Sequence, residues 1–279
     1  METPVPATRT TVPTLDSLVR RALAGDFARE RASDTHASVA FLTVQGAKHA
    51  GRQAGYLNTV FSIRVGAAVG SCAVEPGQLD ERAVRDTAGR GVAELLGHPD
   101  RAVRVATLDA YLLNVLPHAR HPSARAVRLP AGDSLRKSEA RARAVVSLLP
   151  DGGPVAVIGV VNSVLAALRE RGISYRACDL KGGRTEWGEP VLRDHTRAIA
   201  GCRAVLASGM VLGNGTFEEI AACCRSRELP LVVFAQTGSA VLRELLGSGV
   251  DALSAEPYPF FWLTGDAGEI YTYGGDDHE

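Results

Sequence analysis

The chain has 279 residues, of which 46% are hydrophobic, and its 31 Lys and Arg residues balance its 31 Asp and Glu residues. This length suggests one large domain or two ordinary ones, with enough apolar residues for a core. Zero net charge excludes the basic surface typical of nucleic-acid binding. No apolar run approaches the roughly 20 residues that span a bilayer. We therefore expect neither a nucleic-acid partner nor a membrane partner.

Cysteine usage and the chain ends indicate a cytoplasmic protein. The cysteine count is odd and the spacing is irregular, which is typical of a reducing compartment. The five cysteines are Cys72, Cys178, Cys202, Cys223 and Cys224. Met1–Pro13 is rich in Thr and Pro and lacks the apolar segment of a secretory signal. We expect this lead and the tail Asp276–Glu279 to be disordered.

The first 130 residues predict a small α+β domain, because two β-rich segments lie between helical patterns. Val, Ile, Phe and Thr with glycine punctuation indicate an antiparallel meander. Apolar residues at helical spacing indicate helices, the first with Thr14 as its N-cap. The expected elements are a helix over Leu15–Arg29, strands within Ser38–Val44 and Tyr56–Val74, and helices over Asp80–Leu96 and Arg101–Leu116.

Two histidines follow the last of these helices. His118 and His121 have the i,i+3 spacing that would place two imidazoles on one side of a helix and suit a metal. Pro117 and Pro122 flank the pair and disfavour a helix there. We therefore expect a solvated loop, with a metal site as the alternative.

Residues 131–279 predict a Rossmann-like α/β domain. After a helix over Ser134–Leu149, five short apolar runs alternate with helical or polar segments, which is the pattern of a parallel sheet covered on both faces. A further strand over Ile270–Tyr273 is expected at the sheet edge. The five runs are Val155–Val160, Ser174–Leu180, Ala204–Met210, Leu231–Gln236 and Ala252–Glu256.

Small and polar residues follow each run, where ligands of open parallel sheets bind. They are oxygen donors, hydrogen-bonding groups and glycines that admit close approach to the backbone. We predict that the ligand site is built from Gly159, Asn162, Asp179, Ser208, Gly209, Asn214, Gly215, Thr216, Glu218, Thr237, Gly238, Ser239 and Glu256.

The turn after the first of the five runs lacks a dinucleotide fingerprint. It has one glycine, Gly159, where G-x-G-x-x-G would be needed. Asn162 and Ser163 either cap the next helix or bind a ligand at its N-terminus. Asp179 follows Gly159 by 20 residues, the spacing of an acid that binds ribose hydroxyls, although a surface acid explains it equally well.

The turn Gly213-Asn214-Gly215-Thr216 is the most informative one in the chain. Thr216 and Glu219 fit a capping box, but capping does not explain an Asn between two glycines. Asn-Gly permits positive φ and close approach of a ligand. On the following helix, adjacent Cys223 and Cys224 point about 100° apart. We expect one of them in the core and one partly exposed.

Several of these segments resemble a family of prokaryotic proteins described as heavy-metal chelation proteins. The resemblance implies an enolase-N-terminal-like domain followed by a Rossmann-like domain. Asp109 stands where the family usually has Asn, and residues 236–239 replace a Gly-Pro-Ser type of turn. The segments that carry the resemblance are Val157–Gly159, Arg104–Leu113, Ser208–Ile220 and Gln236–Ser239.

The resemblance and the residues at the strand ends lead to two main hypotheses for the function. The resemblance implies a protein that binds a divalent or transition metal or a metal chelate, whereas the strand ends offer oxygen donors rather than compact Cys and His sets. The alternative is an enzyme that acts on a polar metabolite or a nucleotide-like cofactor, with Asp179 or Glu218 as its base. A structural subunit with a degenerate site is a third reading, and a homodimer is compatible with the composition.

Overall fold

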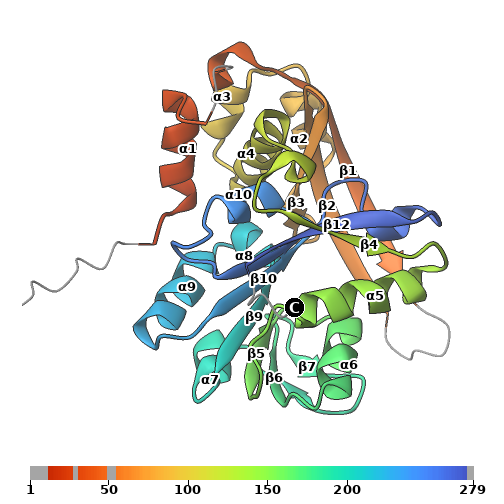
Figure 1. The fold of residues 1–279 in the computed structure, drawn as a ribbon. Helices are drawn as coiled ribbons and strands as arrows, with labels where there is room; N and C mark the ends of the chain where they lie inside the picture. The colour runs from red at the N-terminus through yellow and green to blue at the C-terminus, as the bar shows by residue number, and fades with distance from the viewer. Residues whose placement is uncertain (1–11, 28–30, 49–54, 275–279) are drawn as a thin grey trace, which may run out of the picture.

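The computed structural model describes residues 12–27, 31–48 and 55–274 (Figure 1). The tail Asp276–Glu279 and residues 1–11 of the expected disordered lead lie outside the described residues. The molecule has a small α+β domain followed by a larger α/β domain, so the expected fold class is confirmed. No helix in the described part of the chain is long and apolar enough to cross a membrane.

The first domain begins with helix α1 (Leu15–Ala24) and a three-stranded sheet. The Thr14 side chain accepts a hydrogen bond from the Ser17 amide at 3.2 Å, and α1 ends at Gly25, which has a φ of 84°. The sheet is antiparallel throughout, as the meander pattern predicts, and its middle strand is the second. Its strands are β1 (Ala37–Ala47), β2 (Tyr56–Val65) and β3 (Ala68–Val74).

Three helices follow where two were expected. The segment Asp80–Leu96 forms α2 (Glu81–Thr87) and α3 (Val92–Leu96), because Gly89, with a φ of 83°, breaks the helix between them. The third helix, α4 (Arg101–Val115), packs against β2 and β3. A Cβ at Gly70 would lie 2.0 Å from the Ala110 nitrogen, so glycine is required where β3 crosses α4.

The second domain is built on a seven-stranded sheet. Its five parallel strands match the five apolar runs and are β5 (Val155–Ile158), β6 (Tyr175–Cys178), β9 (Ala204–Ser208), β10 (Leu231–Ala235) and β11 (Ala252–Ala255). The sheet order is β4-β12-β11-β10-β9-β5-β6. The prediction that Ile270–Tyr273 forms an edge strand was wrong, since β12 (Gly268–Tyr273) lies between β11 and the antiparallel edge strand β4 (Arg125–Leu129).

Helices cover both faces of this sheet, as the continuous apolar strands predict. One face packs against α5 (Ser134–Val146) and α6 (Asn162–Glu170) in a core that includes Val145, Leu165 and Val157. The opposite face packs against α7 (His195–Ile199), α9 (Phe217–Ser226) and α10 (Ser239–Arg243), and its core continues into the first domain. The remaining short elements are η1 (Ala32–Asp34), η2 (His118–Arg120), β7 (Gly183–Arg184), β8 (Pro190–Val191), α8 (Met210–Gly213) and η3 (Phe261–Leu263).

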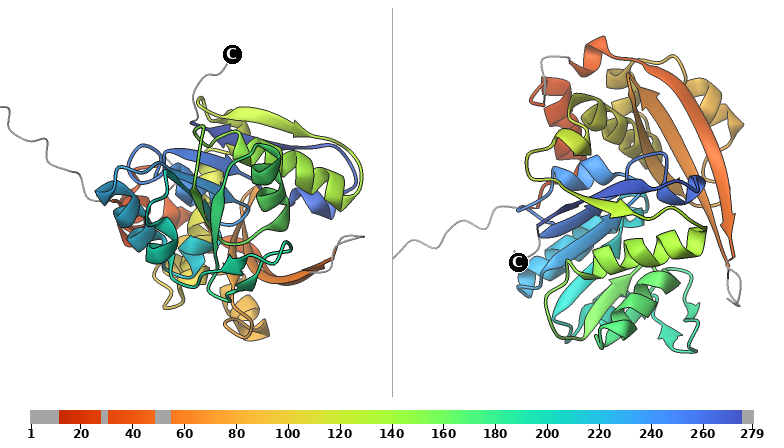
Figure 2. Two further views of the ribbon diagram at one scale, coloured as in Figure 1. Left: turned by 90° about the horizontal axis from the view of Figure 1, so that it is seen from below. Right: turned by 45° about the vertical axis from the view of Figure 1, so that its right-hand side comes forward.

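The two domains share an extensive buried interface. Helix α4 packs against α10 and α8, while β3 packs against α8. Strand β4 belongs to the large sheet although it lies before residue 130, where the domain boundary was expected. The β1–β2 strands extend from the first domain toward the end of α5 (Figure 2, right). This arrangement brings the first sheet over the carboxyl ends of the parallel strands.

Candidate functional site

A cavity of about 770 Å³ lies between the two domains. Its walls come from the carboxyl ends of β5, β6, β9 and β10, from the β1–β2 strands, and from α5 and η3. This is where open parallel sheets bind ligands, and the volume is typical of a small-molecule site. We take this cavity as the candidate site.

The cavity brings together eight of the thirteen residues predicted from the sequence. These are Gly159, Asn162, Asp179, Ser208, Gly209, Asn214, Thr216 and Thr237. The other five, Gly215, Glu218, Gly238, Ser239 and Glu256, are not among the residues that line it. The strand ends thus converge as expected, while several side chains beside them serve other contacts.

Gly159 and Asp179 shape the turns after β5 and β6. Gly159 has a φ of 89°, and a Cβ there would lie 2.4 Å from the Ser208 hydroxyl oxygen. Only glycine fits this position without displacing Ser208. The Asp179 carboxylate accepts hydrogen bonds from the Val160 amide at 3.3 Å and the Lys181 amide at 3.0 Å. Asp179 therefore ties the two turns together at the cavity wall.

Helix α6 begins at the cavity without a side-chain cap. Its N-cap is Val161, and no side-chain capping hydrogen bond forms. Of the two roles considered for Asn162 and Ser163, helix capping is therefore wrong; both side chains instead line the cavity. The first amides of an α-helix have no partner within the helix and favour a negative or polar group.

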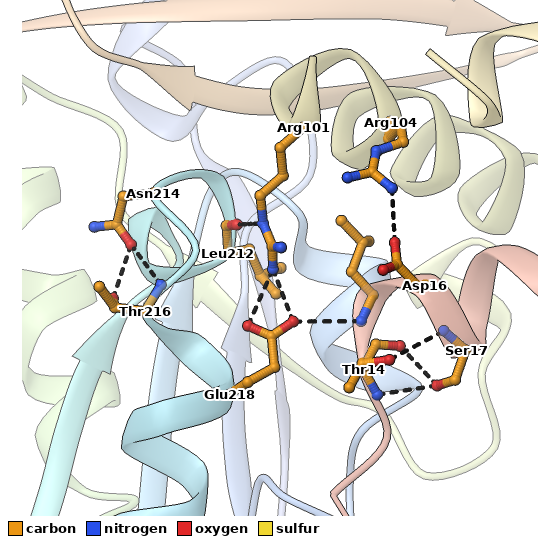
Figure 3. Close-up of polar contacts among 10 residues, drawn as sticks. Thr14, Asp16, Ser17, Arg101, Arg104, Leu212, Asn214, Thr216 and Glu218 are labelled. Carbon is orange, nitrogen blue, oxygen red and sulfur yellow. Dashed lines mark hydrogen bonds and ion pairs between the residues drawn. The ribbon is translucent and has the colours of Figure 1, made fainter. Parts of the chain in front are cut away.

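The Asn214 turn has a different geometry from the one expected. Asn214 has a φ of −84°, and Gly215 alone takes the positive value, 78°. The Asn214 Oδ1 accepts hydrogen bonds from the Thr216 amide at 3.1 Å and the Thr216 hydroxyl at 2.8 Å (Figure 3). Because its oxygen serves the turn, the Asn214 amide nitrogen is the atom suited to donate to a ligand.

The predicted capping box at Thr216 and Glu219 is not formed. Thr216 is the N-cap of α9, but its ψ is −6° and its side chain makes no capping hydrogen bond. The Glu219 carboxylate instead lies 3.8 Å from Nε2 of His195. The cause is the helical backbone conformation of Thr216, whose hydroxyl donates to Asn214 Oδ1 and makes no capping bond.

Glu218 joins the domains and does not line the cavity. Its carboxylate accepts two hydrogen bonds from the Arg101 guanidinium, at 2.8 and 3.1 Å, and Arg101 Nε also donates to the Leu212 carbonyl at 2.7 Å (Figure 3). The Leu15 amide lies 3.5 Å from the same carboxylate. The Glu218 carboxylate is therefore engaged in contacts between the domains and is not positioned to contact a ligand in the cavity.

The turn after β10 docks onto the first domain. Gly238, with a φ of 65°, donates its amide to the Ser71 carbonyl at 2.8 Å. The buried Asp109 carboxylate accepts hydrogen bonds from the Ser71 amide at 3.0 Å and the Ala240 amide at 2.8 Å. Burial raises the pKa of Asp109 to about 7, against the lowering effect of these hydrogen bonds and of Arg243.

His118 is a buried structural histidine, so the prediction of a solvated loop was wrong for it. Its Nδ1 lies 2.7 Å from the Tyr273 hydroxyl and its Nε2 lies 3.0 Å from the Ser239 hydroxyl. Burial, followed by the charge of Arg243, lowers the pKa of His118 to about 3. Ser239 therefore serves this buried contact, and His121 stays partly exposed beside Tyr273.

Glu256 lies behind the cavity wall in a buried ion pair. Its Oε1 is 2.5 Å from Nε of Arg141, and both side chains are almost fully buried. The Arg141 guanidinium lies 4.7 Å above the ring of Phe234, and both residues line the cavity. Trp262 lines the same end, with Tyr56 6.1 Å away between ring centroids. This end of the cavity is aromatic.

The sequence did not reveal the cationic side chains of the cavity. Four residues that are cationic at neutral pH line it, against two acidic ones, Glu75 and Asp179. Arg193 Nη2 donates to the Lys181 carbonyl at 3.1 Å, which holds the turn after β6. An arginine-rich composition hid these residues, because single arginines on separate elements form no sequence motif. The four are Arg141, Lys181, Arg184 and Arg193.

The donor set does not fit a directly bound metal ion. No group of three or more His, Cys, Asp or Glu residues that could hold a metal occurs among the described residues. All five cysteines are free, and burial raises the pKa of the Cys178 thiol, which lines the cavity, to about 11. Cys224 is buried and Cys223 partly exposed, as expected. Thiolate and imidazole ligands at compact spacing, which soft metals prefer, are not assembled in this part of the chain.

Searches with protein-family models and among curated proteins give no match to this chain. Two solved structures match nearly the whole chain. One is a protein of unknown function from the DUF364 family of Desulfitobacterium hafniense, with a TM-score of 0.61, 12% sequence identity, and coverage of 93% of this chain and 96% of that one. The other is a DUF364 protein of unknown function from Pyrococcus horikoshii, with a TM-score of 0.54, 15% identity, and coverage of 92% and 98%.

A further match is to an enolase family member from Agrobacterium tumefaciens, with 15% identity and coverage of 85% of this chain and 98% of that one. Its TM-score of 0.33 is too low to support a conclusion about this chain. At these identities the two DUF364 matches establish a shared fold. The chain thus has the two-domain α/β fold of DUF364 proteins whose function is unknown.

Proposed function

We propose that the interdomain cavity binds a small polar molecule that carries an anionic group. The observation that supports this most directly is the excess of cationic over acidic side chains around a cavity at the strand carboxyl ends, which remains three to two when Arg141, paired with Glu256, is left out. A cavity with such walls focuses the potential and favours negatively charged ligands. The uncapped N-terminus of α6 adds backbone amides at the same wall.

The two ends of the cavity favour different parts of such a ligand. An anionic group would bind where the start of α6 follows β5 and Lys181 follows β6. Arg193, between β8 and α7, reaches this turn through its hydrogen bond to the Lys181 carbonyl. Phe234 and Trp262 lie at the other end and would pack against a flat or apolar group. We therefore favour an amphipathic metabolite over a simple inorganic ion as the natural ligand.

A metal would enter this cavity only as a chelate. The described residues offer no cluster of metal-binding side chains, whereas an organic acid that already holds a metal would present its carboxylates to the cationic wall. This form of the proposal agrees with the resemblance to heavy-metal chelation proteins. It predicts that the organic anion, and not the metal ion, provides most of the affinity.

Isothermal titration with citrate, pyrophosphate, sulfate and the citrate complexes of Fe(III) and Ni²⁺ tests this proposal. We expect citrate and its complexes to bind, and free Ni²⁺ and Zn²⁺ to give no specific heat. The substitution Arg193→Gln should weaken citrate binding about fivefold or more, because it removes a wall charge.

The substitution Arg197→Gln is the matched control, since Arg197 lies on the same segment but does not line the cavity. It should leave the affinity unchanged. Equal affinity of the two variants, or no binding of any of the anions, would refute the anion site. Tight binding of a free metal ion would show that the metal is recognised directly.

Catalysis in the same cavity is the second candidate function. The observation that favours it is a histidine at the wall, His195, beside the Asn214 turn. Native mass spectrometry of the purified protein would identify a retained organic ligand on which a reaction could be tested.

A further inference from the structure

His195 differs from the other side chains of the cavity wall in its chemistry. It is the first residue of α7, and it lines the cavity together with Asp179, Asn214 and Thr216. Histidine is the side chain whose ordinary pKa places its change of charge between pH 5 and 8. His195 is the one histidine among the described residues that line the cavity.

His195 lies on a capped helix start and faces a carboxylate of α9. The Asp194 side chain accepts hydrogen bonds from the amides of Thr196 at 2.8 Å and Arg197 at 3.3 Å, so the start of α7 is capped. Across the gap to α9, the Glu219 carboxylate lies 3.8 Å from His195 Nε2. The side chain of His195 is 20% exposed, whereas that of Glu219 is 74% exposed.

We infer that His195, paired with Glu219, is the group through which the cavity takes up a proton when it binds an anion. This inference rests on the proposed anion-binding function and names its pH-dependent residue. Binding of the anion would bring one proton from solvent to the imidazole, and the imidazolium would then attract both the ligand and Glu219. No other group needs to change its charge.

The surrounding charges are compatible with this role. The acidic groups on the neighbouring elements are Glu219 of α9, Asp194 before α7 and Asp179 after β6. The basic groups are Arg193 and Lys181, which line the same cavity, and Arg197 on the same helix. Glu218 is engaged by Arg101. A bound anion would attract an imidazolium at the cavity wall, so anion binding and protonation of His195 should be linked.

Sulfate is the probe, because its charge is constant over the pH range of interest. Its affinity, measured by NMR titration, should be at least about fivefold higher at pH 5.5 than at pH 8.5 in the wild-type chain. By reciprocity, adding sulfate at constant pH should move the NMR signals of the His195 ring toward those of the imidazolium. The signals are assigned by comparison with the His195→Gln variant.

Three variants separate this role from a structural one. His195→Gln should bind sulfate with the same affinity at both pH values. Glu219→Gln should keep the pH dependence, because the proposal places the proton on the imidazole. His36→Gln replaces an exposed histidine that does not line the cavity and should behave as wild type.

The outcomes distinguish the two proposals. Sulfate binding with equal affinity at both pH values in the wild-type chain would overturn the role of His195 while leaving the anion site in place. A pH dependence that persists in His195→Gln would do the same. No sulfate binding at either pH would overturn the role of His195, whereas the anion site is refuted only if citrate and pyrophosphate also fail to bind.

Discussion

The Asp109 carboxylate of α4 accepts a hydrogen bond from the Ala240 amide at the start of α10, at 2.8 Å. Its other oxygen accepts from the Ser71 amide of β3 at 3.0 Å. One buried side chain thus connects two elements of the first domain with a helix of the second. The domains are joined by specific polar contacts in addition to apolar packing.

The raised pKa of Asp109 predicts a pH-dependent stability. Burial raises this pKa from 3.8 to about 7, so the folded chain retains a proton that the unfolded chain releases near pH 4. The contribution of Asp109 to the free energy of unfolding is therefore fully present below pH 4 and is lost as the pH rises through 7. Relative to Asp109→Asn, the wild-type chain should lose roughly 2–4 kcal/mol between pH 4 and 8. Urea unfolding at several pH values measures this, and a constant difference would contradict it.

Glu218 gives a test that separates structure from ligand binding. Its ion pair with Arg101 is about one quarter exposed at each side chain and crosses the domain interface. A double-mutant cycle with Arg101→Met and Glu218→Gln should give a coupling of about 1 kcal/mol in urea unfolding, because partial exposure screens the pair.

Glu218→Gln should also leave the affinity for citrate unchanged, since the residue does not line the cavity. Arg193→Gln is the comparison, because Arg193 does line it. A loss of citrate affinity in Glu218→Gln that equals the loss in Arg193→Gln would show that Glu218 takes part in binding.

Much of the fold could be predicted from local pattern. Four of the five parallel strands, β5, β9, β10 and β11, are apolar runs buried along their whole length, which makes them visible in the sequence. The fifth, β6, lies at the sheet edge and has an exposed Arg176. Strand β4 was missed because Arg125 and Arg128 interrupt its apolar residues at the edge of the sheet.

The site was harder to predict, because its walls come from distant segments. Strand-end positions identified Gly159, Asn162 and Asn214, but the partner of Glu218 is 117 residues away at Arg101. The role of Arg193 depends on the turn it packs against, and that of His195 depends on α9. No local spacing encodes such contacts, so chemistry alone could not separate a cavity residue from an interface residue.

Alanine substitutions at Gly159 and Gly172 separate two reasons for a glycine: a close contact with a neighbouring side chain and a positive φ. Gly159→Ala places a methyl group 2.4 Å from the Ser208 hydroxyl at a φ of 89°, so both steric overlap and backbone strain oppose it. Gly172 has a φ of 67°, and a Cβ there would meet no described atom within 4 Å, so Gly172→Ala carries the strain alone. We expect a loss of about 1 kcal/mol for Gly172→Ala and roughly 2–4 kcal/mol for Gly159→Ala. Equal losses in thermal or urea unfolding would show that Ser208 moves away freely.

His118 should show the opposite pH dependence to Asp109. Its pKa falls from 6.5 to about 3 on folding, because burial and Arg243 disfavour the imidazolium. The unfolded chain therefore binds more protons between pH 3 and 6.5, and the contribution of His118 to stability is present above pH 6.5 and is lost as the pH falls through 3. Relative to His118→Gln, the wild-type chain should gain stability as the pH rises from about 4 to 6.5.

Between about pH 4 and 6.5 the opposite contributions of Asp109 and His118 to the free energy of unfolding offset each other. The stability of the wild-type chain should therefore vary less with pH than that of either single variant. Asp109→Asn should reveal the rise due to His118, and His118→Gln should reveal the fall due to Asp109. The double variant should again be flatter, and His36→Gln should follow the wild-type profile because its side chain is exposed. If the single variants follow the wild-type profile too, then neither group retains a shifted pKa in the folded chain, and the polar contacts around α10 must be hydrated.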